Sequence, residues 1–517
     1  MKEIIMGYLK RRDFLGNMGV CAAGTLGSKL IMSHPGTVQD AQILQLSKNE
    51  KNISPRDVKI NVKPVSSYII HGGVWTGPCR WNPNPPPEEE KARFRNYAAE
   101  SIKTLEQHVS QDARILEPVY IEYPEATGFG EKQLVQLRAD NEKVDLYLIS
   151  GNVYPQYPGS LIGERYKKPV AMITNYVNWE LSARLRSKGL EGYAPADHDE
   201  LNDLISILRA RKVFQNTNLL IISNTPLNNR PAPGACTDFK GLNDRFGFNA
   251  TFIDYKEFTE ERDRVMNSRD MMGEVEKLSD RLIKNAQEVR IDRKWVISSV
   301  LFYCAVKNLL TRYNCNAFTI ECFEFCSSKL AYDWKVVPCL THSLLKDEGY
   351  PSGCEGDINV SLAMDLLMGL SKKSAYMGNL YIKDRNTMYL GHNVPAMKMM
   401  GFDKPDLPYS LQNFITEGWG PKVQMDLSKF EEKTVTIARC NPLASKILVT
   451  KGTITGCEGF AEVGCSLKVL VNIPDTKGLV KKAHNYGFHF AMVYGDYTDK
   501  IYELAGMLDL EVESHNV

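Results

Sequence analysis

Several familiar catalytic and cofactor-binding motifs are missing from this chain of 517 residues. There is no GxGxxG fingerprint and no phosphate-binding P-loop, so a nucleotide cofactor is not indicated. No GxSxG elbow supports a serine hydrolase, and no HExxH pair supports a zinc peptidase. The sequence also has no CxxC pair, no heptad run and no internal repeat. What remains is a set of carboxylate, amide and imidazole side chains from separate segments of the chain.

An excess of charge of one sign is also lacking. The 63 Lys and Arg residues balance 62 Asp and Glu residues, which leaves a net charge of +1. This balance gives no electrostatic case for a nucleic-acid or membrane-surface partner. No apolar run reaches the length of a membrane span, so we expect no transmembrane helix. The length allows several domains, each with a full hydrophobic core.

The N-terminus carries features of an export signal. Residues 10–15 read Lys-Arg-Arg-Asp-Phe-Leu, and a modest apolar stretch follows as far as Met32. Weak hydrophobicity after paired arginines suits the twin-arginine route better than a standard secretory signal. The sequence predicts a twin-arginine-type signal over residues 1–35, a polar linker over 36–57, and a periplasmic location. The alternative is a basic tail on a cytoplasmic protein.

The twelve cysteines are scattered along the chain and form no recognisable framework. Such a distribution predicts buried free thiols, which are typical of a reducing compartment. It is compatible with export only if the protein folds in the cytoplasm first, as twin-arginine substrates do.

Apolar strands alternate with helical segments through the first three quarters of the chain. Continuous apolar runs at residues 144–150 and 219–223 are typical of buried parallel strands. The alternation predicts two doubly wound, Rossmann-like α/β domains, over residues 58–166 and 167–373. Ligands bind beyond the carboxyl ends of the strands in such sheets. Candidates for substrate contact there are Trp75, Arg80, Trp81, Tyr154 and Trp179, although aromatic residues of α/β domains more often belong to the core.

Residues 374–517 have a different pattern. Short alternating strands, for example at 433–439 and 467–472, are separated by turn residues. This pattern predicts a small antiparallel β-barrel in a C-terminal domain. The predicted fold class is therefore α/β, with two Rossmann-like domains followed by a barrel-containing one.

The run Cys354-Glu355-Gly356-Asp357 places two carboxylates at the start of an apolar helix. Asp357 suits the N-cap position, and on these residues alone a capped helix is the simpler interpretation. Glycines on either side of Glu355 allow the backbone to bend so that its carboxylate points outward. Glu355 could then bind a hard metal ion or carry a proton.

Two histidines in the last part of the chain are further candidates. His489 alternates with apolar and aromatic neighbours in a strand, where a buried core histidine is the common case. His392 lies in a turn after a strand, and this position suits a metal ligand and an ordinary turn residue equally well. With Glu355 and the strand-end amide Asn379, they form a carboxylate, amide and imidazole set that suits Mn²⁺ or Mg²⁺.

Several runs of the C-terminal half share the pattern of one enzyme family. They are Pro338-Cys339-Leu340, Glu348-Gly349-Tyr350-Pro351, Cys354-Glu355-Gly356-Asp357, Met377-Gly378-Asn379 and residues 487–497. From residue 317 onward the chain resembles the L-fucose isomerase-like sugar isomerases. Over residues 58–313 the resemblance is loose and rests on the α/β pattern. It implies two α/β domains beside a small barrel, with a cleft between domains that a neighbouring subunit often completes.

The resemblance also implies a Mn²⁺ site. The family's metal-binding Glu falls on Glu355 and its His on His489, whereas the position of its Asp is occupied by Asn379. An amide oxygen can coordinate a hard cation, but it cannot act as a general base. The related arabinose isomerases add a histidine ligand, and His392 is the residue that could fill this role.

With Asn379 at this position, either another group takes the proton, or the chemistry has changed, or catalysis is lost. Three nearby carboxylates could replace the missing base. Asp357 is the first candidate because it shares the helix start with Glu355, and Glu321 and Asp384 come next. The resemblance thus implies Glu355 and Asp357 as catalytic residues, and Glu355, Asn379, His489 and His392 as metal ligands.

By this resemblance the chain is expected to be a metal-dependent aldose–ketose isomerase. It would act on a small sugar through an ene-diol and assemble as a homo-oligomer, either a trimer or a hexamer. Two alternatives stay open. One is a non-catalytic carbohydrate-binding relative, and the other is a metal-dependent lyase or epimerase that acts on a sugar derivative.

Overall fold

The computed structural model describes residues 54–71, 85–152, 154–174, 179–225 and 238–516, together with the backbone of two short strands at 74–77 and 80–83. The predicted export signal, most of the predicted linker, and the side chains of Trp75, Arg80 and Trp81 lie outside the described residues. Among the described helices, none is both long and apolar enough to cross a membrane.

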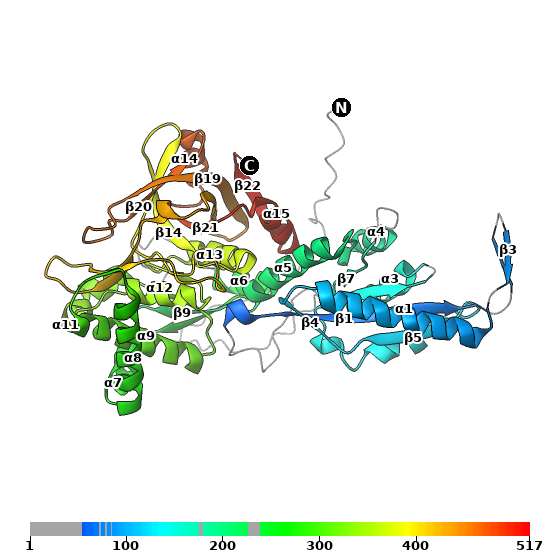
Figure 1. Ribbon diagram of the computed structural model, residues 1–517. Helices are drawn as coiled ribbons and strands as arrows, with labels where there is room; N and C mark the ends of the chain where they lie inside the picture. Colours follow the sequence, from blue (N-terminus) through cyan, green and yellow to red (C-terminus); the bar gives the residue numbers. More distant parts are fainter. Residues whose placement is uncertain are drawn as a thin grey trace, which may run out of the picture. The chain divides into compact units, whose positions relative to one another are not determined.

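The first part of the described chain forms a parallel sheet (Figure 1). Its central strand β1 (Ile60–Ile70) pairs with β6 (Leu146–Gly151) on one side and with β4 (Ala113–Ile115) and β5 (Val119–Pro124) on the other. The sheet continues through β7 (Val170–Ala171) and β8 (Gly192–Tyr193). Its helices are α1 (Pro87–His108), α2 (Glu131–Leu134), α3 (Gln156–Tyr166), α4 (Glu180–Ser187) and α5 (His198–Gln215).

Helices cover both faces of this sheet. On one face Tyr147 belongs to an apolar core with Ile162 of α3. On the other face Leu146 belongs to a core with Leu105 of α1 and Leu208 of α5. Neighbouring strand residues point to opposite faces, so the continuous apolar run of β6 serves both cores. The predicted parallel α/β arrangement is confirmed here, while the closer likeness to a Rossmann domain stays a prediction.

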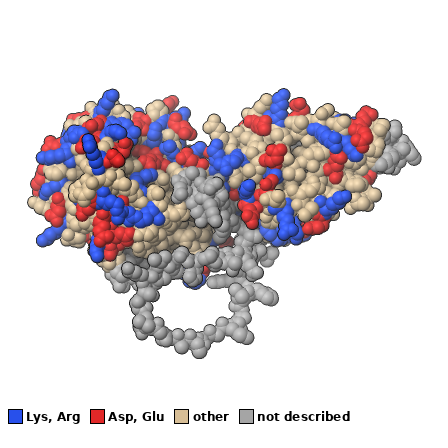
Figure 2. All heavy atoms as spheres, turned by 90° about the horizontal axis from the view of Figure 1, so that it is seen from below, with Lys and Arg blue, Asp and Glu red and all other residues tan. Residues whose placement is uncertain are grey.

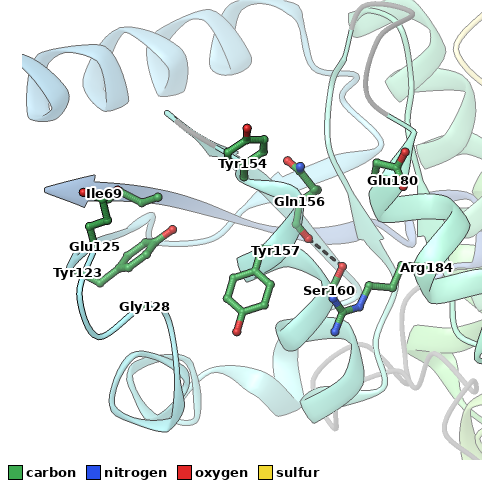
Figure 3. A pocket seen from close by; sticks show the side chains of 10 residues that line it. All are labelled: Ile69, Tyr123, Glu125, Gly128, Tyr154, Gln156, Tyr157, Ser160, Glu180 and Arg184. Atoms are coloured by element: carbon green, nitrogen blue, oxygen red, sulfur yellow. Dashed lines mark hydrogen bonds between the residues drawn. The ribbon is translucent and has the colours of Figure 1, made fainter. Parts of the chain in front are cut away.

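A hollow of about 450 Å³ lies at the carboxyl ends of β1 and β5. Figure 3 shows the tyrosines Tyr123, Tyr154 and Tyr157 around it, with Arg184 at one side. Tyr154, one of the predicted substrate-contact residues, thus lines a hollow where α/β sheets commonly bind ligands. Trp179 is 60% exposed and does not belong to the core of this sheet.

A second parallel sheet follows, in the order β10 (Asn249–Ile253), β9 (Asn218–Ile222), β12 (Ala317–Ile320) and β13 (Ser352–Gly353). Its helices are α6 (Phe239–Phe246), α7 (Tyr255–Met266), α8 (Arg269–Asn285), α9 (Arg293–Arg312), α10 (Cys322–Ser327), α11 (Leu330–Trp334), α12 (Cys339–Asp347) and α13 (Ile358–Ser371). There are two further small sheets among the described residues. One pairs β2 (Val74–Gly77) with β3 (Arg80–Pro83), between β1 and α1 in the chain, and the other consists of β11 (Glu288–Arg290), β16 (Ser410–Asn413) and β17 (Pro421–Gln424).

The predicted antiparallel barrel is confirmed. Its strands run in the order β18 (Thr434–Cys440), β21 (His489–Tyr494), β14 (Tyr376–Ile382), β15 (Thr387–Gly391), β20 (Lys468–Asn472) and β19 (Lys446–Glu458), and β18 pairs with β19 to close it. Figure 1 shows these strands in yellow to orange. β22 (Glu511–His515) adds to β19 in parallel, and α14 (Thr476–Ala483) and α15 (Thr498–Met507) lie in the same part of the chain. Closure removes the free sheet edges and fixes the register of every strand.

Acidic and basic side chains are interspersed on the face that Figure 2 shows, without gathering by sign. This distribution matches the near-zero net charge of the sequence.

A buried carboxyl lies where α13 meets α5. Thr217 Oγ1 lies 3.0 Å from the carbonyl oxygen of Val213 and 2.6 Å from Asp365 Oδ2. A hydroxyl has one hydrogen, and the carbonyl oxygen can only accept it, so the second contact is best satisfied when Asp365 is protonated and donates. Burial raises the pKa of Asp365 to about 7.

Asp365→Asn is therefore expected to stabilise the protein increasingly as the pH rises. The pKa of Asp365 is raised on folding, so its stabilising contribution is complete below about pH 4 and is lost as the pH rises to about 7. Between pH 5 and 8 the unfolding free energy of the variant should rise relative to the wild type by about 2 kcal/mol. Urea unfolding at pH 5 and pH 8 measures this change, and Asp333→Asn, which changes an exposed carboxyl, is the control. If the unfolding free energies of Asp365→Asn and of the wild type changed equally with pH, the prediction would be wrong.

Candidate metal centre

Glu355 lies in the turn between β13 and α13, at the carboxyl end of the second parallel sheet. Glu355 and Gly356 both have left-handed backbones, with φ of 58° and 63°. The Gly356 N–H donates to the carbonyl oxygen of Ile320, at the end of the neighbouring strand β12, over 3.0 Å. A left-handed Glu costs about 1 kcal/mol, and such strain is commonly found at functional sites.

Three barrel strands bring the other candidate ligands to one place. His489 is the first residue of β21 and pairs with Asn379 on β14. Asn379 pairs on its other side with Gly391 of β15, and His392 comes next in the chain. Directly paired residues of an antiparallel sheet point to the same face, so Asn379 and His489 share one face of the barrel wall.

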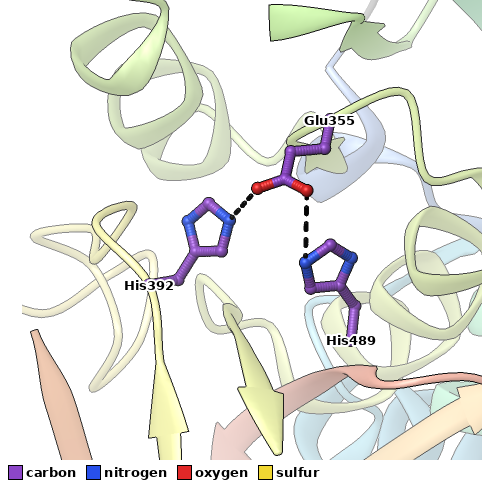
Figure 4. A group of neighbouring side chains, drawn as sticks. All are labelled: Glu355, His392 and His489. Atoms are coloured by element: carbon purple, nitrogen blue, oxygen red, sulfur yellow. Dashed lines mark hydrogen bonds and ion pairs between the residues drawn. The ribbon is translucent and has the colours of Figure 1, made fainter. Parts of the chain in front are cut away.

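Glu355, His392 and His489 converge, as Figure 4 shows. His392 Nε2 lies 3.2 Å from Glu355 Oε1, and His489 Nε2 lies 3.6 Å from Glu355 Oε2. One potential ligand atom from each residue lies within 4.8 Å of the others, and all three side chains are buried. Among the described residues this is the one group of at least three His, Cys, Asp or Glu side chains with such spacing.

The carboxylate of Asp357 lies behind His489. Its Oδ2 is 3.0 Å from His489 Nδ1 and accepts a hydrogen bond from Arg439 Nη1 at 2.8 Å. Its Oδ1 accepts from the Val360 N–H at 3.0 Å, which is the N-cap bond predicted from the sequence, and from Arg439 Nη2 at 3.3 Å. Asp357 is fully buried, and both of its oxygens are occupied.

These contacts set the ionisation of the centre. Burial acts to raise the pKa of Asp357, but the Arg439 guanidinium and the bond to His489 outweigh it and hold the pKa below its usual value. An ionised Asp357 only accepts hydrogen bonds, so His489 Nδ1 must donate. The other ring nitrogen, Nε2, faces Glu355 and has no hydrogen-bond partner among the described residues, as in a histidine ligand oriented by a carboxylate.

The pKa of Glu355 is also below its usual value. Burial acts to raise it, but the hydrogen bond to His392 and the nearby His489 ring outweigh that effect. Burial lowers the pKa of His392, against the opposing influence of Glu355. The centre therefore offers an ionised carboxylate and a neutral imidazole near pH 7, the states in which both groups bind metals.

Asn379 contributes an unsatisfied oxygen. Its Oδ1 is buried and has no hydrogen-bond partner among the described residues, while its Nδ2 donates to the Tyr381 hydroxyl at 3.3 Å. A buried amide oxygen without a partner costs free energy unless something binds it. The carboxylate of Glu355 and the two imidazoles fit a divalent cation such as Mn²⁺. Asn379 shares a face of the barrel wall with His489, so its amide oxygen is a candidate fourth donor.

The other two carboxylates considered from the sequence do not belong to the group of Glu355, His392 and His489. Glu321 caps α10 by accepting from the Phe323 N–H at 3.3 Å. Asp384 lies in the exposed turn between β14 and β15, where it accepts from the Asn386 N–H at 2.9 Å.

Two features of the centre were not predicted from the sequence. Arg439 is 2% exposed in a strand that has no other charged residue, and such a position could have signalled a buried partner. Helix α12 holds the segment after His392, since Lys346 donates to the carbonyl oxygen of Val394 and Asp347 accepts from the Met397 and Lys398 N–H groups at 3.0 and 2.7 Å. Nothing in the sequence of α12 indicated this contact.

Comparison with known proteins points to sugar isomerases. A search with family models gives no match. A protein named sulfoquinovose isomerase from Priestia aryabhattai is 24% identical over 325 residues, which cover 60% of this chain and 67% of the relative. The protein of that name from Priestia megaterium gives the same figures. The one from Alkalicoccus urumqiensis is 24% identical over 334 residues, 61% of this chain and 69% of the relative. This likeness supports the predicted class, an isomerase that acts on sugars.

Proposed function

We propose that this chain is a divalent-metal-dependent aldose–ketose isomerase of the fucose isomerase-like type, with Mn²⁺ as the preferred ion and Mg²⁺ as the alternative. The observation that carries the proposal is the convergence of Glu355, His392 and His489 from three distant segments of the chain. The names of its relatives support the same reaction class. Export by the twin-arginine route and a trimeric or hexameric assembly remain part of the proposal.

The contacts of each residue indicate its role in the proposed reaction. Glu355, His489, His392 and the amide oxygen of Asn379 would hold the cation. When bound, a divalent cation polarises the substrate carbonyl and stabilises negative charge that develops on oxygen. The buried position of Glu355, His392 and His489 keeps bulk water away from the reacting carbons.

Proton transfer between the two carbons is assigned to Glu355. The sequence favoured Asp357 as the second catalytic carboxylate, but Arg439, His489 and the Val360 N–H occupy its oxygens. These contacts favour Asp357 as a positioning residue for His489. Glu355 is ionised, so a carboxylate oxygen that does not bind the cation can accept a proton from one carbon and return it to the next.

The proposal predicts one Mn²⁺ per chain and isomerisation with solvent exchange. Metal-free protein loaded with Mn²⁺ would be analysed for bound metal and then assayed on a panel of aldoses that includes sulfoquinovose. In D₂O, transfer through an ene-diol should place deuterium at the exchanging carbon, which NMR of the product detects. A chain that retains no cation after loading contradicts the proposal.

A non-catalytic carbohydrate-binding protein is the second candidate, because Asn379 lacks the carboxyl group expected of a base. Sugar binding without turnover across the panel would favour it. Turnover that depends on Glu355 would exclude it, and a product other than the ketose would favour the lyase or epimerase alternative.

A further inference from the structure

Two thiols lie beside the candidate metal centre. The sulfur atoms of Cys354 and Cys322 are 3.9 Å apart. Parallel pairing of β12 with β13 sets Thr319 opposite Gly353, so the chain segments that follow, which carry the two cysteines, leave the sheet side by side. Cys354 immediately precedes Glu355 in the chain.

We propose that Cys322 and Cys354 are an oxidisable pair, and that their disulfide weakens metal binding by displacing Glu355. A disulfide requires the sulfurs to approach to about 2 Å, so they must move together by roughly 2 Å. Cys354 is buried and followed by the left-handed Glu355, so a shift of its backbone or side chain is passed to the metal-binding carboxylate. The effect on metal rests on the proposed function, whereas formation of the disulfide does not.

The oxidant for this disulfide is a peroxide. The sulfur of Cys322, which is partly exposed, attacks one peroxide oxygen; the O–O bond breaks, and a sulfenic acid and one water result. The sulfur of Cys354 then attacks the Cys322 sulfur, the S–O bond breaks, and a second water leaves. The two thiols lose two electrons and two protons, and the peroxide is reduced to two waters.

Other thiols lie near Cys322 and could form a disulfide with it in place of Cys354. Cys326, Cys339 and Cys465 lie near enough to interact with it electrostatically. The sulfur of Cys322 lies in contact with the sulfur of Cys354, at 3.9 Å. The pairing is therefore a specific outcome that peptide mapping can test.

The test uses the reduced full-length protein, treated with stoichiometric hydrogen peroxide. Peptide mapping should identify a Cys322–Cys354 disulfide, Mn²⁺ affinity should fall by about 10-fold or more, and dithiothreitol should restore it. Cys322→Ser should keep its Mn²⁺ affinity under peroxide, whereas Cys304→Ser, which changes a thiol of α9, should respond like the wild type.

Oxidation that links other cysteines overturns the proposal, as does a Cys322–Cys354 disulfide that leaves Mn²⁺ affinity unchanged. Reduced protein that binds no Mn²⁺ contradicts the proposed function instead, and the peptide map still decides whether the thiol pair forms.

Discussion

Glu355→Gln is expected to abolish stoichiometric Mn²⁺ binding and to lower kcat/KM by about 10²-fold to 10⁴-fold. The amide keeps the size of the side chain, but it removes the negative charge between His392 and His489 and the group that accepts the proton. Metal analysis after loading, together with steady-state kinetics, measures both losses.

Glu417→Gln is the matched control, because it makes the same chemical change at an exposed position. It should bind one Mn²⁺ per chain with unchanged kinetics. If Glu355→Gln retained the metal at wild-type affinity, the assignment of Glu355 as a ligand would be wrong.

Asp357→Asn is expected to lower both stability and metal affinity. The amide has no charge to balance the buried Arg439, and loss of one partner from a buried ion pair costs about 3–5 kcal/mol. His489 also loses the carboxylate that orients its ring, which should weaken Mn²⁺ binding by about 10-fold to 100-fold. Urea unfolding of the metal-free protein and Mn²⁺ titration measure the two effects separately.

The double variant Asp357→Asn with Arg439→Met separates charge balance from ring orientation. It removes both charges, so its stability should exceed that expected from adding the two single effects. Metal affinity should stay low, because His489 still lacks its partner. An Asp357→Asn variant with wild-type Mn²⁺ affinity would show that Asp357 does not position His489.

Much of the fold follows from local patterns. The apolar run at residues 219–222 forms β9 in a parallel sheet, and the alternating segment at 434–440 forms a barrel strand. The N-cap role of Asp357 was predicted and is present. Such features depend on neighbours in the chain, so periodicity and capping preferences are sufficient to identify them.

Roles that depend on distant partners did not follow from the sequence. His392 was compatible with either a turn residue or a ligand, and the pairing of β14 with β15 places it beside Glu355. The sequence ranks Asp357 first among the possible bases, whereas its contact with Arg439 depends on a distant part of the chain.

The sequence by itself therefore determined the parallel sheets, the barrel, the position of Glu355 before a capped helix, and the absence of a carboxylate at Asn379. Only the tertiary structure decided which side chains face one another. Closure of the barrel fixes the register that sets Asn379 opposite His489, and this register depends on pairings between strands that are far apart in the sequence. The position of Cys322 against Cys354 was decided in the same way, by the pairing of β12 with β13.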